Sequence, residues 1–277
     1  MDGARDTAAL LSLEEQAANS RIEARYAAAE DLYRRALSLA TQSFGEYAIE
    51  TVRVLNNFGV LYKYMGRFPE AWKLYRRALL IIKKTRGADS LEAATLYHNL
   101  GGLDHARGHY ERGEVFARRS VAIREKALGP DDPAVAADIA ALAAILDARS
   151  TREEAECLYL RALVVFERVF GPQHYELAVQ LNNLAALYQA KGDVERAESL
   201  YRRALGIKEK VLDPNHPEIA MTLNNLAVLC RSQDRLAEAE QLYRRAVVIF
   251  TEGLGKTHPH VLSCLDNYAR LLKSLDW

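Results

Sequence analysis

The hexapeptide Leu-Tyr-Arg-Arg-Ala-Leu at Leu200–Leu205 returns along this chain at a fixed interval. Close copies begin at Leu32, Leu74 and Leu242, and looser copies stand at 158–163 and 116–121. Neighbouring copies are always 42 residues apart, as in 242 − 200 and 74 − 32, with no insertion or deletion. A strict period of this length predicts a stacked array of repeats rather than one globular core. Arrays of this kind usually bind other molecules and seldom catalyse reactions.

One repeat contains two apolar stripes at the helical period. The first stripe comprises Leu181, Leu184, Ala185, Leu187 and Tyr188, and the second runs from Val194 to Leu212. Gly192 and Asp193 form a turn signal between them, and Pro217 lies just inside the next helix. Each unit is therefore predicted to be a helix, a tight turn, a longer helix and a short linker. Neither helix can bury its stripe alone, so neighbouring units must stack.

Small residues recur at three positions of the repeat, where they allow two helices to approach closely. The three sets are Gly59, Gly101, Ala143, Ala185, Ala227 and Ala269; Ala29, Ala71, Gly113, Ala155, Ala197 and Ala239; and Ala36, Ala78, Ser120, Ala162, Ala204 and Ala246. Together with the recurring tyrosine, this small-aromatic-small pattern resembles the tetratricopeptide repeat, lengthened here from about 34 residues.

The resemblance extends to one particular type of tetratricopeptide repeat. Leu181-Asn-Asn-Leu-Ala-Ala-Leu-Tyr188 and Leu223-Asn-Asn-Leu-Ala-Val-Leu-Cys230 resemble the first helix of kinesin-light-chain-type repeats, and so do the linkers 128–133, 212–217 and 254–259. The similarity covers about residues 45–277. A kinesin light chain carries a long heptad coiled coil before its repeats, and residues 1–27 are too short for three or four heptads. We therefore do not expect a motor subunit.

The pattern predicts an all-α, right-handed superhelical solenoid of six helix pairs plus a C-terminal helix. Residues 1–27 are predicted to be an N-terminal capping region with a helix over about 7–20. The repeat array follows over 28–257, and a C-terminal capping helix lies in 258–277, running from about Pro259 to Leu275. We expect one continuous domain. Its two ends are expected to differ from the inner repeats, because repeat arrays need atypical ends to stay soluble.

Composition excludes several classes of protein. The 277 residues contain 37 Lys plus Arg and 37 Asp plus Glu, whereas nucleic-acid binders usually carry a basic excess. No apolar run is long enough to span a membrane, and the start lacks the apolar core of a signal peptide. Cys157, Cys230 and Cys264 follow no ligand spacing and are expected to be buried or half-buried. We predict a cytoplasmic protein with neither nucleic acid nor membrane as a partner.

Asparagine pairs recur in the first helix of the repeat, although asparagine is a poor residue inside a helix. The pairs are Asn56-Asn57, Asn182-Asn183 and Asn224-Asn225, with His98-Asn99 and Asp266-Asn267 as variants. Either the amides bind the backbone of an extended peptide in the concave groove, or they bond the neighbouring repeat and only hold the stack together. We expect at least one amide of each pair to bind peptide. Ala140-Ala141 leaves a gap that is either sequence drift or a pocket for a bulky apolar side chain.

Other polar residues share that face of the first helix. Lys63, His105, Gln189, Arg231 and Lys273 follow seven positions after the first residue of each pair. Arg53 and Arg270 join them, so both ends of the face are basic and would favour an acidic peptide or a C-terminal carboxylate. An ordinary solvated face is the alternative. The predicted peptide-binding set is Arg53, Asn56, Asn57, Lys63, His98, Asn99, His105, Asn182, Asn183, Gln189, Asn224, Asn225, Arg231, Asn267, Arg270 and Lys273.

Two further patterns indicate structure rather than chemistry. Glu-to-Arg pairs four residues apart, at Glu30–Arg34, Glu114–Arg118, Glu198–Arg202 and Glu240–Arg244, support an exposed helix. His174, His216 and His258 share one register and are predicted to start helices, because stacked helices lie too far apart for them to share a metal. Phosphate loops and catalytic signatures are absent from the sequence. We expect no enzyme activity, no cofactor and no metal.

The predicted function is a scaffold or adaptor that holds a peptide segment in the groove. A first alternative is a structural or regulatory module that self-associates or packs on another domain. Its docking edge would be the apolar face of the last helix, with Leu271, Leu272 and Trp277. A second alternative is an enzyme whose site carries no recognisable motif. The sequence leaves the partner's identity open.

Overall fold

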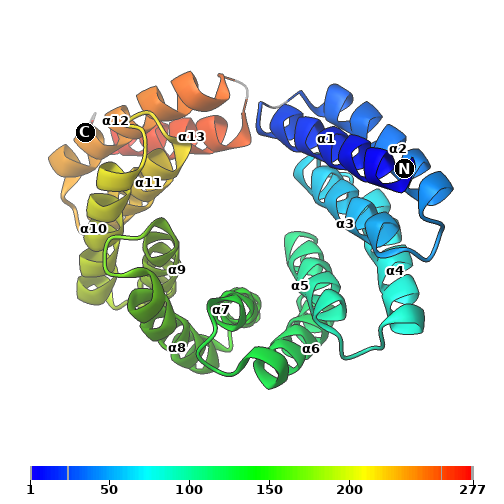
Figure 1. Cartoon of the computed structure of the whole chain (residues 1–277). Coiled ribbons are helices and arrows are strands. Elements are labelled where there is room, and N and C mark those ends of the chain that lie inside the picture. Colours follow the sequence, from blue (N-terminus) through cyan, green and yellow to red (C-terminus); the bar gives the residue numbers. More distant parts are fainter. Residues whose placement is uncertain (1, 24, 257, 276–277) are drawn as a thin grey trace. The chain divides into compact units, whose positions relative to one another are not determined.

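The computed structural model describes residues 2–23, 25–256 and 258–275, and every regular element in those ranges is an α-helix. The helices are α1 (Asp2–Ile22), α2 (Tyr26–Ser43), α3 (Ile49–Tyr64), α4 (Phe68–Thr85), α5 (Leu91–Ala106), α6 (Tyr110–Leu128), α7 (Pro133–Ala148), α8 (Arg152–Phe170), α9 (Tyr175–Lys191), α10 (Val194–Val211), α11 (Pro217–Ser232), α12 (Leu236–Leu254) and α13 (Pro259–Leu275). The predicted all-α repeat fold is confirmed (Figure 1).

The 42-residue period sets where helices begin. The odd-numbered helices are here called first helices, and from α5 onward each starts 42 residues after the first helix before it, as in 91 − 49 and 259 − 217. The even-numbered second helices do the same from α2 to α12, as in 68 − 26. The helices fall into two compact units, residues 1–149 with α1–α7 and residues 150–277 with α8–α13. Each unit is described by itself below.

Between α3 and α12, each turn from a first to a second helix contains one residue in the left-handed region. That residue is Gly66, Gly108 or Gly192 in three repeats, with φ of 70°, 72° and 80°. Ser150 and Asp234 take the same conformation at φ 65° and 61°. Residues other than glycine seldom adopt positive φ. The repeat geometry therefore imposes this turn whatever residue occupies it.

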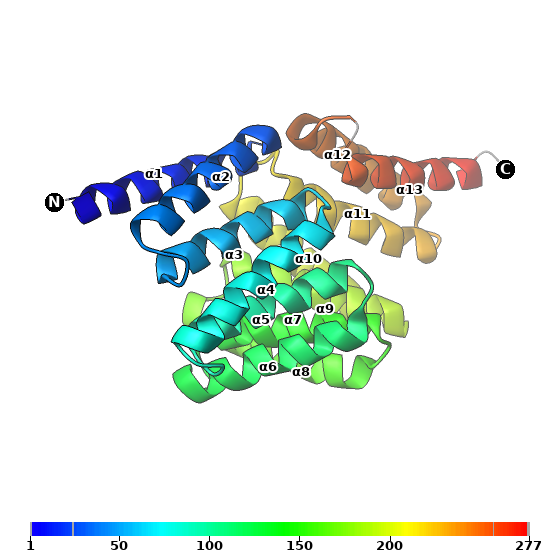
Figure 2. The same ribbon diagram turned by 90° about the vertical axis from the view of Figure 1, so that its right-hand side faces the viewer.

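In unit 1 the first helices α1, α3, α5 and α7 form one layer, and α2, α4 and α6 form the other (Figure 1 and Figure 2). The layers meet through small residues and buried aromatic rings. A Cβ placed on Gly59 would lie 2.6 Å from the ring of Tyr75, which is fully buried. A Cβ on Gly101 would lie 3.2 Å from the carbonyl oxygen of Gly113. The predicted close approach of helices at small residues is thus confirmed in this unit.

In unit 2 the first helices α9, α11 and α13 pack against α10 and α12, with Tyr201 and Tyr243 buried between the layers. The three register-related histidines begin the first helices. Nδ1 of His174, His216 and His258 each accepts a bond of 3.2 Å from the backbone N–H two residues later. The prediction that these histidines start helices is confirmed.

Two expectations need adjustment. Helix α1 is longer than the predicted 7–20 and packs along α2, as the later first helices pack along their second helices. Cys157 is exposed on α8, so the prediction that it is buried or half-buried is wrong, whereas Cys230 and Cys264 are buried. Within the described ranges, no helix has the length and apolar character needed to cross a bilayer.

Candidate functional site

The asparagines of unit 1 are half-buried and bond from one first helix to the next, and the side of the first helices that carries them is here called the first-helix face. Asn99 donates to the amide oxygen of Asn56 at 2.6 Å, and Asn56 donates to Asn57 at 3.2 Å. Asn57 donates to the carboxylate of Glu14 at 3.2 Å, and Arg53 donates to both oxygens of that carboxylate. One hydrogen-bonded line therefore runs across α5, α3 and α1.

Unit 2 repeats the arrangement. Asn225 donates to Asn182 at 3.4 Å, and Asn267 donates to Asn224 at 3.3 Å. In each case, as for Asn99 and Asn56, the second residue of one asparagine pair donates to the first residue of the preceding pair, 43 residues earlier. These bonds are those of the structural alternative, in which the amides hold the stack together.

Asn183 differs from the other second asparagines. The residue 43 positions before it is Ala140, which carries no side-chain acceptor. No side-chain hydrogen bond from Asn183 occurs among the described residues, and the side chain is half-buried. Ala140 itself is only 5% exposed, so it is packed and not an open pocket for a ligand side chain.

His98 takes part in a buried polar cluster that the sequence prediction missed. Its Nδ1 lies 2.7 Å from an oxygen of Asp138, a carboxylate with no exposed side-chain surface. Arg124 donates to the same oxygen at 2.8 Å, and the Ser120 hydroxyl donates to the other oxygen at 2.5 Å. The sequence does contain a signal for this cluster, namely the charge of Asp138. The residues at the equivalent position of the other repeats are all uncharged: Val54, Leu96, Gln180, Thr222 and Cys264.

Lys63 and His105 meet on the first-helix face of unit 1, beside a glycine that leaves them room. A Cβ on Gly102 would lie 3.0 Å from Nζ of Lys63. Burial lowers the pKa of Lys63. Burial also lowers the pKa of His105, the charge of Lys63 adds to that effect, and Asp147 opposes it. Among the described residues no carboxylate lies within ion-pair distance of the Lys63 ammonium. A half-buried cation of this kind is stabilised by an anionic group from a ligand.

The other basic residues of the predicted set differ in how they are paired. In unit 1, Arg53 forms an ion pair with Glu14 at 2.7 Å. In unit 2, Arg270 forms an ion pair at 2.7 Å with Asp266, which precedes it by four residues on α13. Arg231 donates to the backbone carbonyl of Asn267 at 3.5 Å. The remaining predicted residues of unit 2 are Gln189, whose amide oxygen accepts from the Tyr201 hydroxyl at 3.0 Å, and Lys273, which is exposed. Within the described part of the chain, the Lys and Arg residues of the predicted set that have no carboxylate partner are thus Lys63, Arg231 and Lys273.

Glutamates near the start of the second helices bind between repeats as well as within a helix. Glu198 pairs with Arg202 at 2.7 Å in its own helix and with Arg235 at 2.7 Å from the following repeat. Glu30 pairs likewise with Arg34 and with Arg67. The predicted Glu-to-Arg pairs are confirmed at all four positions, but they are not merely exposed helix pairs. Arg235 and Arg202 lower the pKa of Glu198 to about 2.

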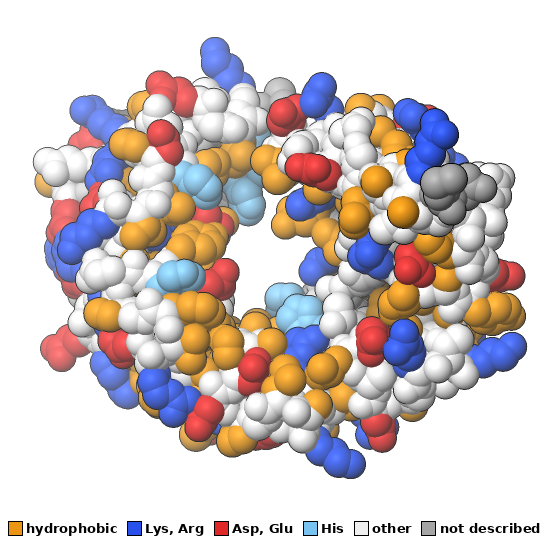
Figure 3. All heavy atoms as spheres, in the orientation of Figure 1, with side chains coloured by type: hydrophobic (Ala, Val, Ile, Leu, Met, Phe, Trp, Pro, Cys, Tyr) orange, Lys and Arg blue, Asp and Glu red, His pale blue; other side chains and the backbone are white. Residues whose placement is uncertain are grey.

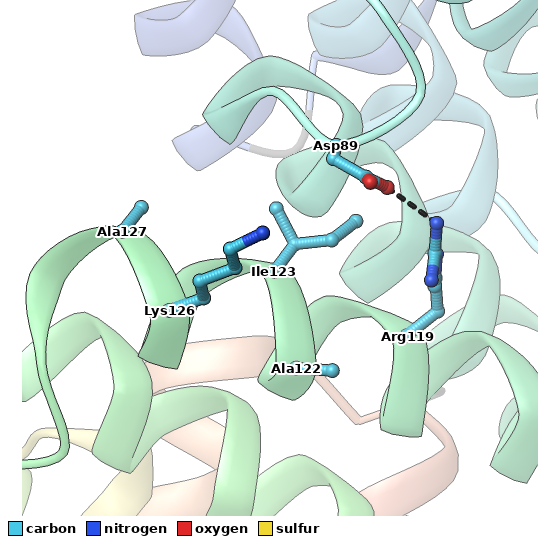
Figure 4. Close-up of a pocket in the computed structure, with 6 residues that line it drawn as sticks. All are labelled: Asp89, Arg119, Ala122, Ile123, Lys126 and Ala127. Atoms are coloured by element: carbon cyan, nitrogen blue, oxygen red, sulfur yellow. Dashed lines mark hydrogen bonds and ion pairs between the residues drawn. The ribbon is translucent and has the colours of Figure 1, made fainter.

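The pocket in Figure 4 contains no residue of the predicted set. It has a volume of about 370 Å³ and is lined by residues of α6 and by Asp89 of the linker between α4 and α5. Asp89 and Arg119 point toward one another and form an ion pair. On the face drawn in Figure 3, acidic and basic side chains are interspersed, and the chain as a whole has zero net charge. Groups of three or more metal-ligating side chains are absent from the described ranges.

Comparison with known families agrees with this geometry. A tetratricopeptide repeat model matches residues 6–79, 61–126, 92–168, 137–210, 176–252 and 218–276. The chain belongs to the tetratricopeptide repeat family. Tetratricopeptide repeats generally mediate protein–protein interaction, and each forms a helix pair like those seen here. No curated protein matches the chain.

Several solved tetratricopeptide structures are similar. BtubC (BKLC) from P. vanneervenii is 27% identical with a TM-score of 0.64, over 89% of this chain and 94% of that one. A putative kinesin light chain with nearly identical repeats from Podosopora anserina is 23% identical with a TM-score of 0.59, over 73% of this chain and 96% of that one. The APC/C component Cut9–Hcn1 is 13% identical with a TM-score of 0.68, over 95% of this chain and 43% of that one. The predicted resemblance to kinesin-light-chain-type repeats is confirmed.

Proposed function

We propose that this chain is a non-enzymatic protein-interaction scaffold that holds an extended, acidic peptide segment against its first-helix face. The observation that carries the proposal is Lys63. Its ammonium is half-buried beside Gly102 and has no carboxylate within ion-pair distance among the described residues. A partner's Asp, Glu or C-terminal carboxylate would supply the missing charge.

The first-helix face of unit 2, taken by itself, has features that also support a peptide ligand. Asn183 offers an amide that can both donate to and accept from a peptide backbone. In unit 2, Lys273 is exposed and Arg231 contacts only a backbone carbonyl, so both favour an acidic segment. The other predicted residues stay predictions for this face. We place the function in the cytoplasm because the three cysteines are free thiols.

Selection from a displayed library of random peptides tests the proposal. We expect the peptides that bind the whole chain to share an acidic residue at a fixed position. We expect Lys63→Met, which keeps the aliphatic stem, to weaken their binding about tenfold, because a charge-assisted bond contributes about 1.5–3 kcal/mol. Fluorescence anisotropy with labelled peptides gives the affinities, and the dependence of affinity on salt should become less steep in the variant.

Lys73→Met is the matched control, since Lys73 is exposed on α4 in the other layer and its loss should leave the affinity unchanged. Selected peptides without acidic residues, or peptides that bind Lys63→Met as well as the natural chain, would contradict the proposal.

Asn183 and Asn225 are expected to respond differently to the same change. Asn183→Ala should weaken the selected peptides about fivefold and leave stability unchanged, because the loss of one hydrogen bond costs about 1 kcal/mol. Asn225→Ala should lower the free energy of unfolding by about 1 kcal/mol and leave affinity unchanged, because it breaks the bond to Asn182. Anisotropy and urea titration separate the two effects. Equal behaviour of the two variants would show that Asn183 has no special place in binding.

A further inference from the structure

Helix α13 presents an apolar stripe to solvent. Leu262, Leu265 and Leu272 are 54%, 41% and 39% exposed, and Ala269 between them is also exposed. Their spacing of three, four and three residues places all four on one side of the helix. A contiguous apolar stripe left exposed on a helix marks a surface that another element binds.

The internal repeat shows what kind of element covers this stripe elsewhere. The four positions equivalent to the stripe are Ala220, Leu223, Ala227 and Cys230 in α11, and Ala178, Leu181, Ala185 and Tyr188 in α9. All eight are at most 4% exposed. Helix α12 packs along α11, and α10 packs along α9. The stripe of α13 is thus the surface that a second helix buries in the two preceding repeats of unit 2.

We infer that α13 docks one amphipathic helix of a partner protein in the place of a second helix. The required pattern is the one that α12 presents to α11, with small, aromatic and small residues at Ala239, Tyr243 and Ala246, all fully buried. In unit 1 the ring of Tyr75 covers Gly59, which is the register counterpart of Ala269. An aromatic ring of the partner helix takes the same place over Ala269.

A charged residue at the edge of the stripe restricts the partner further. Lys273 has the register of Gln189, and Gln189 accepts a hydrogen bond from the Tyr201 hydroxyl of its second helix. Lys273 can only donate, so a tyrosine oxygen or a carboxylate of the partner helix is the matching group. A second copy of α13 fits poorly because its stripe contains no aromatic residue. Its one tyrosine, Tyr268, stacks on Tyr243 of the same chain with ring centres 5.8 Å apart.

The test uses the whole chain with labelled leucine methyl groups and, as a probe, a synthetic peptide copying residues 234–256. We expect methyl signals of Leu262, Leu265 and Leu272 to shift and saturate at peptide concentrations of about 0.1–1 mM, since a short isolated helix must fold as it binds. A peptide carrying Tyr243→Ala should bind at least about fivefold more weakly.

Leu265→Arg in the protein should abolish the shifts, and Leu272→Arg serves as a second variant if the first does not fold. Val248→Arg is the matched control, because Val248 is 54% exposed on α12 outside the stripe. Either of two results overturns the inference. One is a saturating excess of peptide that leaves the three leucines unshifted. The other is sedimentation equilibrium showing a dimer that Leu265→Arg dissociates, which would make a second copy the occupant. Trp277, also predicted for this edge, lies outside the described residues.

Discussion

Replacing Asp138 with Ala is expected to lower the free energy of unfolding by about 3–5 kcal/mol, the cost of leaving a buried charge without its partner. The Asp138 carboxylate is fully buried and accepts from Arg124, whose side chain is only 12% exposed. Without that carboxylate, the guanidinium is held in the interior with only a backbone carbonyl and the Thr95 hydroxyl to bond. Urea titration followed by circular dichroism measures the loss.

Combining Asp138→Ala with Arg124→Leu is the informative control. The double variant removes both charges, so it should recover much of the stability that the single variant loses. His98→Ala removes a neighbour that is partly exposed and should cost less than Asp138→Ala. A single Asp138→Ala variant within about 1 kcal/mol of the natural chain would show that the cluster does not hold α5, α6 and α7 together.

Glu198→Gln is expected to lower the free energy of unfolding at neutral pH by about 2 kcal/mol, the scale of a hydrogen bond to a charged group. Arg235 and Arg202 hold the pKa of Glu198 at about 2, below its usual 4.5. The unfolded chain takes up the proton first as pH falls, so the stabilisation is complete above about pH 4.5 and is lost between there and about pH 2. Thermal unfolding of both proteins across this range gives the difference.

The two stability curves should therefore converge as the pH approaches 2. Comparing the two proteins at each pH cancels the titration of carboxylates that do not share the arginines of Glu198, such as Glu30 and Glu114, whose pKa values are also lowered. Glu195→Gln is the matched control, since Glu195 is exposed on the same helix and has no ion pair among the described residues. A difference that stays constant down to pH 2 would mean that the carboxylate charge is not what stabilises the contact.

Helix positions followed from the sequence because they depend on short-range chemistry. Gly192 ends α9 in the left-handed conformation, and Pro217 begins α11, as their backbone preferences predict. Side-chain partners could not be predicted in this way. Periodicity places Asn225 on the first-helix face but does not say whether Asn182 of the preceding repeat lies within reach. That distance depends on the tilt and spacing of stacked helices, which no single repeat specifies.

The same limit explains Glu14 and the inter-repeat role of Glu198. Glu14 lies in a helix without the Leu-Asn-Asn signature, and only its position 43 residues before Asn57, where the other repeats have an acceptor amide, connects it to that residue. The recurrence of Glu in one register was visible at residues 30, 114, 156, 198 and 240. At residues 30, 114, 198 and 240 an arginine four positions later accounts for the glutamate, so the pattern within one helix does not indicate a second arginine from the next repeat.

The 43-residue offset of the asparagine bonds makes the length of the repeat a chemical requirement. Each amide finds its acceptor one residue beyond a whole period, as in Asn99 to Asn56 and Asn267 to Asn224. Adding or deleting a complete 42-residue unit within either compact unit preserves that offset, so the array can be lengthened or shortened by whole repeats. Adding a single residue within a first helix would separate the donor amide from its acceptor. It would also turn the apolar stripe of the rest of that helix away from the neighbouring helix.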